Sequence, residues 1–193
     1  MLEKSERERI ISLLHKEVIP AIGCTEPIAV ALAVAKAKEL LGKIPEKLDV
    51  FLSANVLKNA MGVGIPGTGM VGLPIAIAMG ALIGKSEYGL EVLKDITSES
   101  IEAGKLMIQN KSIGIHLKEN IEEKLYIEVV ASAGDNTSKV IINKEHSRFS
   151  HLQFNENVLF HLNDEPTGQE IDNDFGFSFN KVCEFALETP VED

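Results

Sequence analysis

Residues 21–41 have the sequence AIGCTEPIAVALAVAKAKELL, which predicts a long buried helix with a well-defined start. We expect Thr25 to be its N-cap and Pro27 to lie in its first turn, since both residue types are favoured there. A run rich in Ala, Val, Ile and Leu then follows to Leu41. The stretch therefore predicts a core helix from about residue 26 to residue 41.

Cys24 stands immediately before this predicted helix and is one of two cysteines in the chain. A thiol at this place faces unpaired backbone N–H groups and the positive end of the helix dipole. Both favour the thiolate, which is the reactive form, whereas apolar surroundings favour the thiol. Considered by itself, a free cysteine is also consistent with a small buried hydrophobe.

The rest of the chain changes character near residue 112. Before it, apolar spacing predicts helices at 3–18, 73–83, 87–95 and 98–110 and a strand at 48–52. After it, short strands separated by turn residues are expected at 113–117, 125–131, 138–143, 148–154 and 158–162. An acidic loop at 163–174 and a helix at 177–188 follow. This order predicts an α+β fold with a helical part, 1–111, and an antiparallel meander with a C-terminal helix, 112–193, in one compact unit.

Composition narrows the classes of function. The chain of 193 residues has a net charge of −10, which argues against a nucleic-acid or anionic-membrane partner. Its longest apolar stretch, 71–83, is too short to span a bilayer. Two distant cysteines without a signal-like leader predict reduced thiols and a cytoplasmic location.

Residues 62–72, GVGIPGTGMVG, form a glycine-rich stretch with two interpretations. The letters match G-x-G-x-x-G, but the polar Lys58-Asn59 step before it and Pro66 within it argue against a dinucleotide site. We expect instead a loop whose N–H groups bind a small anion such as a substrate carboxylate, with Lys58, Asn59 and Thr68 as side-chain donors. The alternative is a glycine-rich turn that permits tight helix packing.

The remaining polar motifs give little support to other chemistry. The five histidines have no metal-binding spacing, and two distant cysteines cannot supply the four ligands of a zinc or iron–sulfur centre, so no metal site is predicted. The sequence contains no G-x-S-x-G elbow, so nothing in it indicates a serine hydrolase. His146 lies in a connection after a predicted strand, where its side chain can either reach a cleft or be solvated.

Four blocks resemble the bacterial and archaeal L-cysteine desulfidase family, which is related to the alpha chain of iron–sulfur L-serine dehydratases. They are GCTEPIA at 23–29, KN at 58–59, GIPGTGMVGLPIA at 64–76 and GLEVLKD at 89–95, and the similarity runs in order over the whole chain. The resemblance implies an enzyme that releases pyruvate, ammonia and sulfide from L-cysteine by a β-elimination without PLP. It also implies help from a 4Fe–4S cluster in the full-length family.

The resemblance assigns roles to particular residues. It implies that Cys24 is the base that removes the α-proton, in agreement with a thiol at a helix start. A possible site role for His146 follows from its alignment with a family histidine. The residues expected to bind the amino-acid substrate are Thr25, Glu26, Lys58, Asn59, Gly67, Thr68 and Gly69, together with His146.

Members of that family are longer, and their cluster-ligating cysteines lie in a C-terminal part that these residues do not contain. We therefore expect the N-terminal half of a lyase, without its own cluster and inactive alone, that forms a homo-oligomer or pairs with a C-terminal half. Two alternatives stay open. One is an L-serine dehydratase-type ammonia-lyase, and the other is a non-catalytic fragment for oligomerisation or small-molecule binding.

Overall fold

A computed structural model describes residues 3–162 and 177–190. The contacts within the chain divide it into two units. The larger is Pro20–Leu162, and the smaller joins Met1–Ile19 with Asn163–Asp193, of which 3–19 and 177–190 are described. The predicted acidic loop, 163–174, lies outside the described residues.

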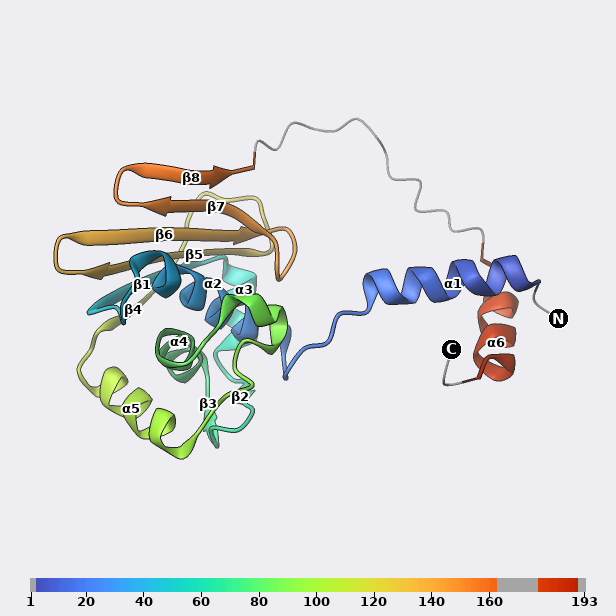
Figure 1. Cartoon of the computed structure of the whole chain (residues 1–193), viewed down its shortest axis with the longest axis horizontal. Helices are drawn as coiled ribbons and strands as arrows, with labels where there is room; N and C mark the ends of the chain where they lie inside the picture. The colour runs from blue at the N-terminus through green and yellow to red at the C-terminus, as the bar shows by residue number, and fades with distance from the viewer. Residues whose placement is uncertain (1–2, 163–176, 191–193) are drawn as a thin grey trace. The chain divides into compact units, whose positions relative to one another are not determined.

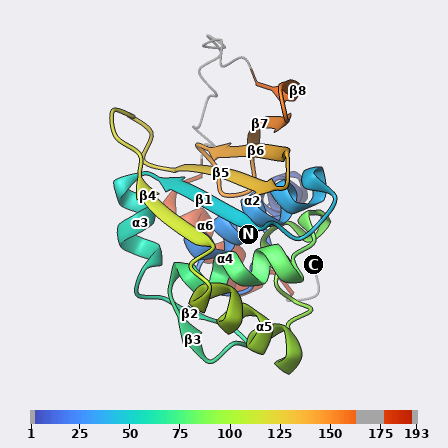
Figure 2. The same ribbon diagram turned by 90° about the vertical axis from the view of Figure 1, so that its left-hand side faces the viewer.

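The larger unit contains a six-stranded sheet with the strand order β4-β1-β5-β6-β7-β8 (Figures 1 and 2). The strands are β1 (Lys47–Leu52), β4 (Ile113–Leu117), β5 (Tyr126–Ala133), β6 (Asn136–Asn143), β7 (Phe149–Phe154) and β8 (Asn157–His161). Burial alternates along the central strands, so that one face of the sheet carries the core. On that face β1 contributes Leu48, Val50 and Leu52, and β5 contributes Ile127 and Val129.

Helices cover this apolar face in successive layers. Helix α2 (Thr25–Leu41) packs on β5 and β6 with one side and on α4 (Leu73–Leu82) with the other. Helix α5 (Ser98–Gln109) packs on α4 in turn, as Figure 2 shows. Because α2 lies between two layers, its residues from Pro27 to Ala35 are all buried. The predicted core helix is therefore confirmed as the centre of the fold.

Small residues set the distance between α2 and α4. A Cβ atom added to Gly80 would lie 2.6 Å from the carbonyl oxygen of Ala31, and one added to Gly84 would lie 2.8 Å from the Cβ of Ala35. The two glycines, one turn apart, let the backbones approach closely. The alanines of α2 that face them have small side chains and do not hold the helices apart. This packing seats α2 directly beneath the sheet and fixes where its N-terminus emerges.

The antiparallel meander predicted after residue 112 is confirmed for β5 to β8, which pair in sequence order. The strand predicted at 113–117 does not belong to this meander. It is β4, which pairs in parallel with β1 at the other edge of the sheet. Strand β1 therefore joins the two predicted parts of the chain, lying between β4 and β5. The α+β class is confirmed, with a sheet that is mainly antiparallel.

Two helical predictions need correction. A short helix, α3 (Ala54–Ala60), follows β1 where no helix was expected, and the Ser53 hydroxyl caps it by accepting from the Val56 N–H. The helix predicted at 87–95 is a 3-10 helix, Ser86–Glu91. Its regular course is interrupted by Gly89, whose φ of +54° a helix does not tolerate.

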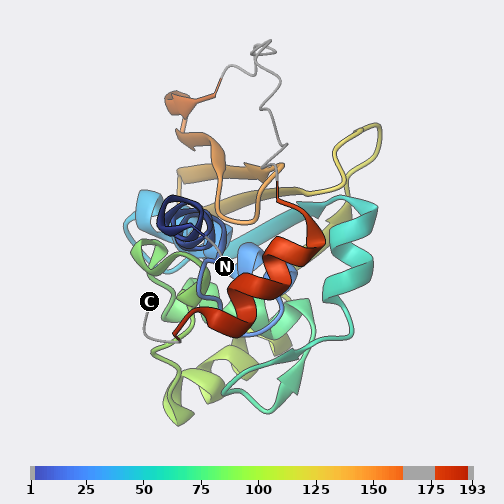
Figure 3. The same ribbon diagram turned by 90° about the vertical axis from the view of Figure 1, so that its right-hand side faces the viewer.

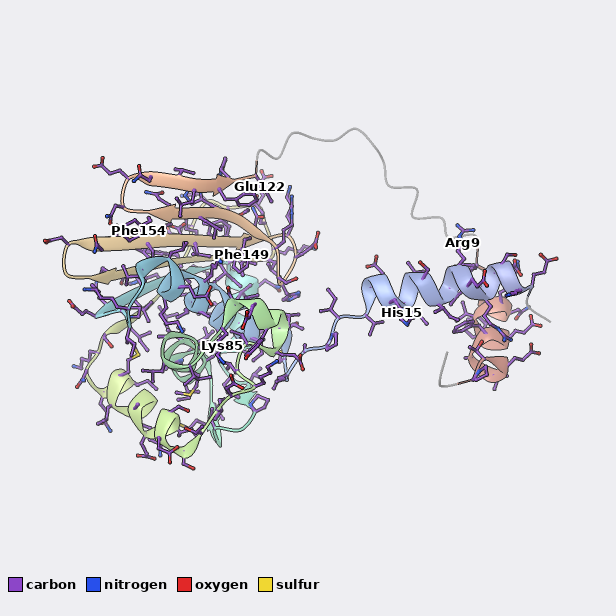
Figure 4. All side chains as sticks on the ribbon, viewed as in Figure 1. Arg9, His15, Lys85, Glu122, Phe149 and Phe154 are labelled. Atoms are coloured by element: carbon purple, nitrogen blue, oxygen red, sulfur yellow. The ribbon has the colours of Figure 1, made fainter. Side chains whose placement is uncertain are left out.

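The smaller unit consists of α1 (Lys4–Glu17) and α6 (Phe179–Glu188), whose axes cross steeply (Figures 1 and 3). An ion pair joins Lys181 to Glu6, and the Arg9 guanidinium lies 5.3 Å from the ring centre of Phe177. Arg9 and His15 are labelled on α1 in Figure 4. A mainly apolar cavity of about 550 Å³ between the helices is lined by residues that include His15 and Phe185. No helix of the described residues is both long enough and apolar enough to cross a membrane.

Candidate functional site

The candidate site is built at the N-terminus of α2. Cys24, not Thr25, is the N-cap residue, with φ −68° and ψ 132°, and Thr25 is the first helical residue. The prediction that Thr25 caps the helix is therefore wrong, and its hydroxyl is free for other partners. Gly23 precedes the cap with φ +87°, and a Cβ atom there would lie 2.7 Å from the Cγ of Pro66. This close contact places the glycine-rich stretch directly against the start of α2.

The centre of the site is a hydrogen bond from the Cys24 thiol to the Glu26 carboxylate. The distance from Sγ to Oε2 is 3.0 Å. Both side chains are half-buried. The bond forms because Cys24 has the extended conformation of an N-cap residue, from which its side chain turns back over the first turn of the helix.

Two residues from distant parts of the chain complete this cluster. Asn59, on α3, donates from Nδ2 to Glu26 Oε1 over 3.1 Å. His146, in the connection between β6 and β7, has its Nε2 atom 3.3 Å from the Thr25 hydroxyl, which also donates to Glu26 Oε2 over 3.4 Å. A hydroxyl has one proton to donate, so the tautomer with Nε2–H on His146 gives a continuous chain from the imidazole through Thr25 to Glu26.

The environment of Cys24 decides between the two opposing influences on its ionisation. Burial raises the pKa of this thiol, and the hydrogen bond to Glu26 and the negative charge of that carboxylate raise it further. The backbone N–H groups of Thr25 and Glu26 do lower the pKa, as predicted for a helix start, but they are outweighed. In this structure Cys24 is therefore a protonated thiol that donates to a carboxylate.

Glu26 has the opposite shift. The hydrogen bond from Cys24 lowers the pKa of this carboxyl most, and its own backbone N–H, the Asn59 amide and the charge of His146 lower it further, against the effect of burial. A carboxylate with donors on both oxygens keeps its charge at neutral pH. The cluster is thus one stable negative charge beside one neutral thiol.

The glycine-rich stretch forms a hairpin of β2 (Gly64–Ile65) and β3 (Met70–Val71). Thr68 is buried in its turn, where its hydroxyl donates to the Ile65 carbonyl over 2.7 Å and accepts from the Met70 N–H. Thr68 therefore holds the turn together, which leaves it no free donor for a substrate. Gly67 and Gly69, with φ of +78° and +65°, are exposed on either side of it.

Lys58 differs from its neighbour Asn59. Both are exposed on α3. Only Asn59 reaches the cluster, and the Lys58 ammonium has no ion pair or hydrogen bond with any residue of the described ranges. Of the predicted site residues, the structure thus joins Cys24, Thr25, Glu26, Asn59 and His146 by hydrogen bonds. Pro66, which was not among the predicted site residues, makes the contact with Gly23.

The thiols available in this chain do not fit a 4Fe–4S cluster. The sequence has two cysteines, Cys24 and Cys183, whereas such a cluster is held by four thiolates. They belong to different units. Within residues 3–162 and 177–190, no three His, Cys, Asp or Glu side chains are grouped so that they could hold a metal ion.

Comparison with known proteins identifies similar proteins, but their names do not state an activity. A protein of Parabacteroides distasonis named "UPF0597 protein" is 60% identical over 190 residues, which are 97% of this chain and 44% of the relative. Proteins with the same name from Phocaeicola vulgatus and Aeromonas hydrophila are 56% and 38% identical, covering 100% and 98% of the chain and 45% and 44% of the relatives. The chain thus spans less than half the length of the curated relatives it matches.

No family model and no solved structure matches the chain. The names of the relatives state neither a substrate nor a reaction. The resemblance to L-cysteine desulfidases therefore bears on function only as a proposal.

Proposed function

We propose that this chain carries the substrate-binding and proton-transfer side of an L-cysteine desulfidase-like lyase. The observation that supports this most is the Cys24–Glu26 hydrogen bond, with Asn59 and His146 bound around it. A thiol and a carboxylate held together at a half-exposed helix start are suited to accept and return a proton at the α-carbon of an amino acid.

The charge of the cluster indicates how such a substrate binds. An amino acid carries an ammonium group and a carboxylate. The ammonium group complements the Glu26 carboxylate, which Asn59 orients. The substrate carboxylate is placed towards the exposed Gly67 and Gly69, where positive φ angles leave backbone groups accessible. We assign no substrate-binding role to Thr68 and no direct contact to Lys58.

Substrate binding would then activate the thiol. The charge of Glu26 contributes to the raised pKa of Cys24, so an ammonium group that neutralises this charge lowers the pKa of the thiol again. The thiol proton then leaves to solvent from the half-buried cluster, since Thr25 and His146 both donate towards Glu26 and cannot carry it to the imidazole. Glu26 thus binds the ammonium group of the substrate and also sets the pKa of the base, Cys24.

The reaction then follows from the thiolate. Cys24 Sγ takes the α-proton, the electron pair of the C–H bond forms the Cα–Cβ double bond, and the Cβ–S bond breaks to release sulfide. The resulting 2-aminoacrylate tautomerises to an imine, which water hydrolyses to pyruvate and ammonia. A 4Fe–4S cluster, which the family resemblance implies, would need ligands from outside this chain.

Sulfide release tests this proposal in the chain joined to the C-terminal part that the resemblance to the desulfidase family implies. We expect Cys24→Ala to lower the rate of sulfide release from L-cysteine by at least about 100-fold, the contribution of a positioned base. Cys183→Ala is the matched control and should retain the rate. Activity that survives Cys24→Ala would contradict the role of the thiol. Ammonia release from L-serine at a higher kcat/KM than from L-cysteine would support the serine dehydratase alternative.

A further inference from the structure

Two histidines that are ten residues apart in sequence meet at the edge of the sheet. His151 on β7 and His161 on β8 are directly paired across the antiparallel strands. Their side chains therefore lie on the same face of the sheet. The two Nδ1 atoms are 3.2 Å apart, and the rings are edge to face with centres 5.4 Å apart.

Hydrogen bonding fixes the tautomer of His151. Its Nε2 atom lies 3.0 Å from Gln153 Oε1, while Gln153 Nε2 donates to the Asn155 carbonyl over 2.6 Å. Since the amide nitrogen of Gln153 is held by that carbonyl, its oxygen accepts the Nε2–H of His151. The Nδ1 atom of His151 therefore carries a lone pair, directed at His161. A metal-ligating histidine is typically held in this way by a partner on its other nitrogen.

The separation of the two nitrogens suits a shared metal ion. Zinc–imidazole bonds are about 2.0–2.1 Å long, so two nitrogens 3.2 Å apart subtend roughly 100–105° at the metal. This is close to the tetrahedral angle of about 109°. Without metal, the same distance is satisfied by a hydrogen bond from His161 Nδ1–H to His151 Nδ1. Loss of the His161 Nδ1 proton to solvent and protonation of its Nε2 atom convert the pair into two ligands.

We propose that His151 and His161 form a zinc-binding site, separate from the cluster around Cys24. Imidazole nitrogens favour borderline ions such as Zn²⁺, Cu²⁺ and Ni²⁺ over Mg²⁺ and Ca²⁺. The described residues place no third His, Cys, Asp or Glu beside the pair, so water completes the coordination of the ion. The site does not depend on the proposed lyase function.

Bound zinc would stabilise the outermost strand. Strand β8 is the edge of the sheet, and all five of its residues are exposed. Its register with β7 also shifts between Leu152 and Gln153. A metal ion held by one histidine from each strand ties β8 to β7 at the end of the hairpin away from its turn.

Calorimetric titration of the chain with Zn²⁺ tests the site. We expect one site that His151→Asn or His161→Asn weakens by about 100-fold or more, and that Gln153→Leu weakens by about tenfold through loss of the fixed tautomer. His116→Asn is the control, because His116 is an exposed strand histidine whose Nε2 pairs with Asp49 instead. Zinc affinity in this variant should equal that of the unmodified chain.

A second measurement locates the ion. On zinc binding, the ¹⁵N resonances of the Nδ1 atoms of His151 and His161 should shift, while the Nε2 resonance of His151 should keep the shift of a protonated nitrogen. Circular dichroism checks that each variant is folded without metal. Equal zinc affinity in all variants, or zinc-dependent shifts confined to Cys24 and Cys183, would overturn the proposal.

Discussion

The Cys24 thiol donates a hydrogen bond to Glu26 Oε2 over 3.0 Å, at the point where α2 begins. A helix start is usually a place where a thiol loses its proton easily. Here the second residue of the helix, Glu26, is a carboxylate that accepts the hydrogen bond of the thiol. Together with burial it raises the pKa of Cys24 above its ordinary value. The residue that suppresses the thiolate is also the one best placed to bind an ammonium group.

Removal of the Glu26 charge should make Cys24 more reactive. We expect Glu26→Gln to lower the pKa of the thiol, because a neutral amide no longer opposes ionisation. The rate of alkylation by iodoacetamide at pH 7 should then rise several-fold, measured in a Cys183→Ala background so that one thiol reacts. Glu119→Gln, an exposed substitution far along the chain, should leave the rate unchanged. A slower reaction in Glu26→Gln would show that the carboxylate assists ionisation.

The neighbours Asn59 and Lys58 should behave differently. Asn59→Ala removes a donor that lowers the pKa of Glu26, so the pKa of this carboxyl should rise. The ¹³Cδ resonance of Glu26, followed against pH, measures the change. Lys58→Ala should leave the Glu26 titration as it is. If both variants shift it equally, Lys58 acts on the cluster and its assignment outside the site is wrong.

The contact between α2 and α4 should not tolerate a larger residue. Gly80→Ala places a methyl group where the Ala31 carbonyl oxygen would be 2.6 Å away, so the helices must separate. We expect the free energy of unfolding to fall by about 1–3 kcal/mol in urea denaturation. Gly62→Ala is the matched control, because a Cβ there meets no atom within 4 Å. A similar loss in Gly62→Ala would contradict the helix contact as the cause, because Gly→Ala in open space should not destabilise the fold.

A buried carboxylate on β5 should make stability depend on pH. Burial alone would raise the pKa of Glu128, but hydrogen bonds from Lys118, Tyr126 and Lys139 outweigh it and lower the pKa. A lowered pKa in the folded state stabilises the fold above the ordinary pKa of a glutamate, and this contribution disappears as the pH falls through the folded-state value.

We therefore expect Glu128→Gln to be less stable than the unmodified chain at pH 7, by about 1–2 kcal/mol, since both lysines are partly solvated. The difference should shrink as the solution is acidified below pH 4, as measured by urea denaturation at a series of pH values. Glu102→Gln, which removes an exposed pair with Lys105, should show no such trend. A difference that stays constant with pH would exclude the carboxylate charge as its cause.

Local patterns predicted most elements because each has a local cause. The helix predicted at 98–110 is α5, which the Thr97 side chain caps, and β4 has the predicted bounds of residues 113 and 117. The parallel partner of β4 could not be predicted, because pairing with β1 depends on packing between segments more than 50 residues apart. Helix α3 could have been found from its Ser53 cap, but seven residues give too short a period for the apolar spacing to stand out.

Sequence reasoning named the residues that meet at the start of α2, together with Lys58 and Thr68, which do not join them, but it did not predict their interactions. The resemblance named Cys24, Glu26, Asn59 and His146, which come from three separate places in the sequence. Only the fold shows that Glu26 accepts hydrogen bonds from two of them and reverses the expected ionisation of the thiol. The His151–His161 pair was missed altogether, since strand register, not sequence spacing, brings it together.

The titration of Cys24 with and without a bound amino acid tests the central claim most directly. L-Serine serves as the ligand because it has no thiol, and the ¹³Cβ resonance of Cys24 reports ionisation in a Cys183→Ala background. We predict that saturating L-serine lowers the pKa of Cys24, and that in Glu26→Gln the pKa begins lower and no longer responds. An unchanged titration in the presence of bound L-serine, or an equal response in Glu26→Gln, would contradict the account.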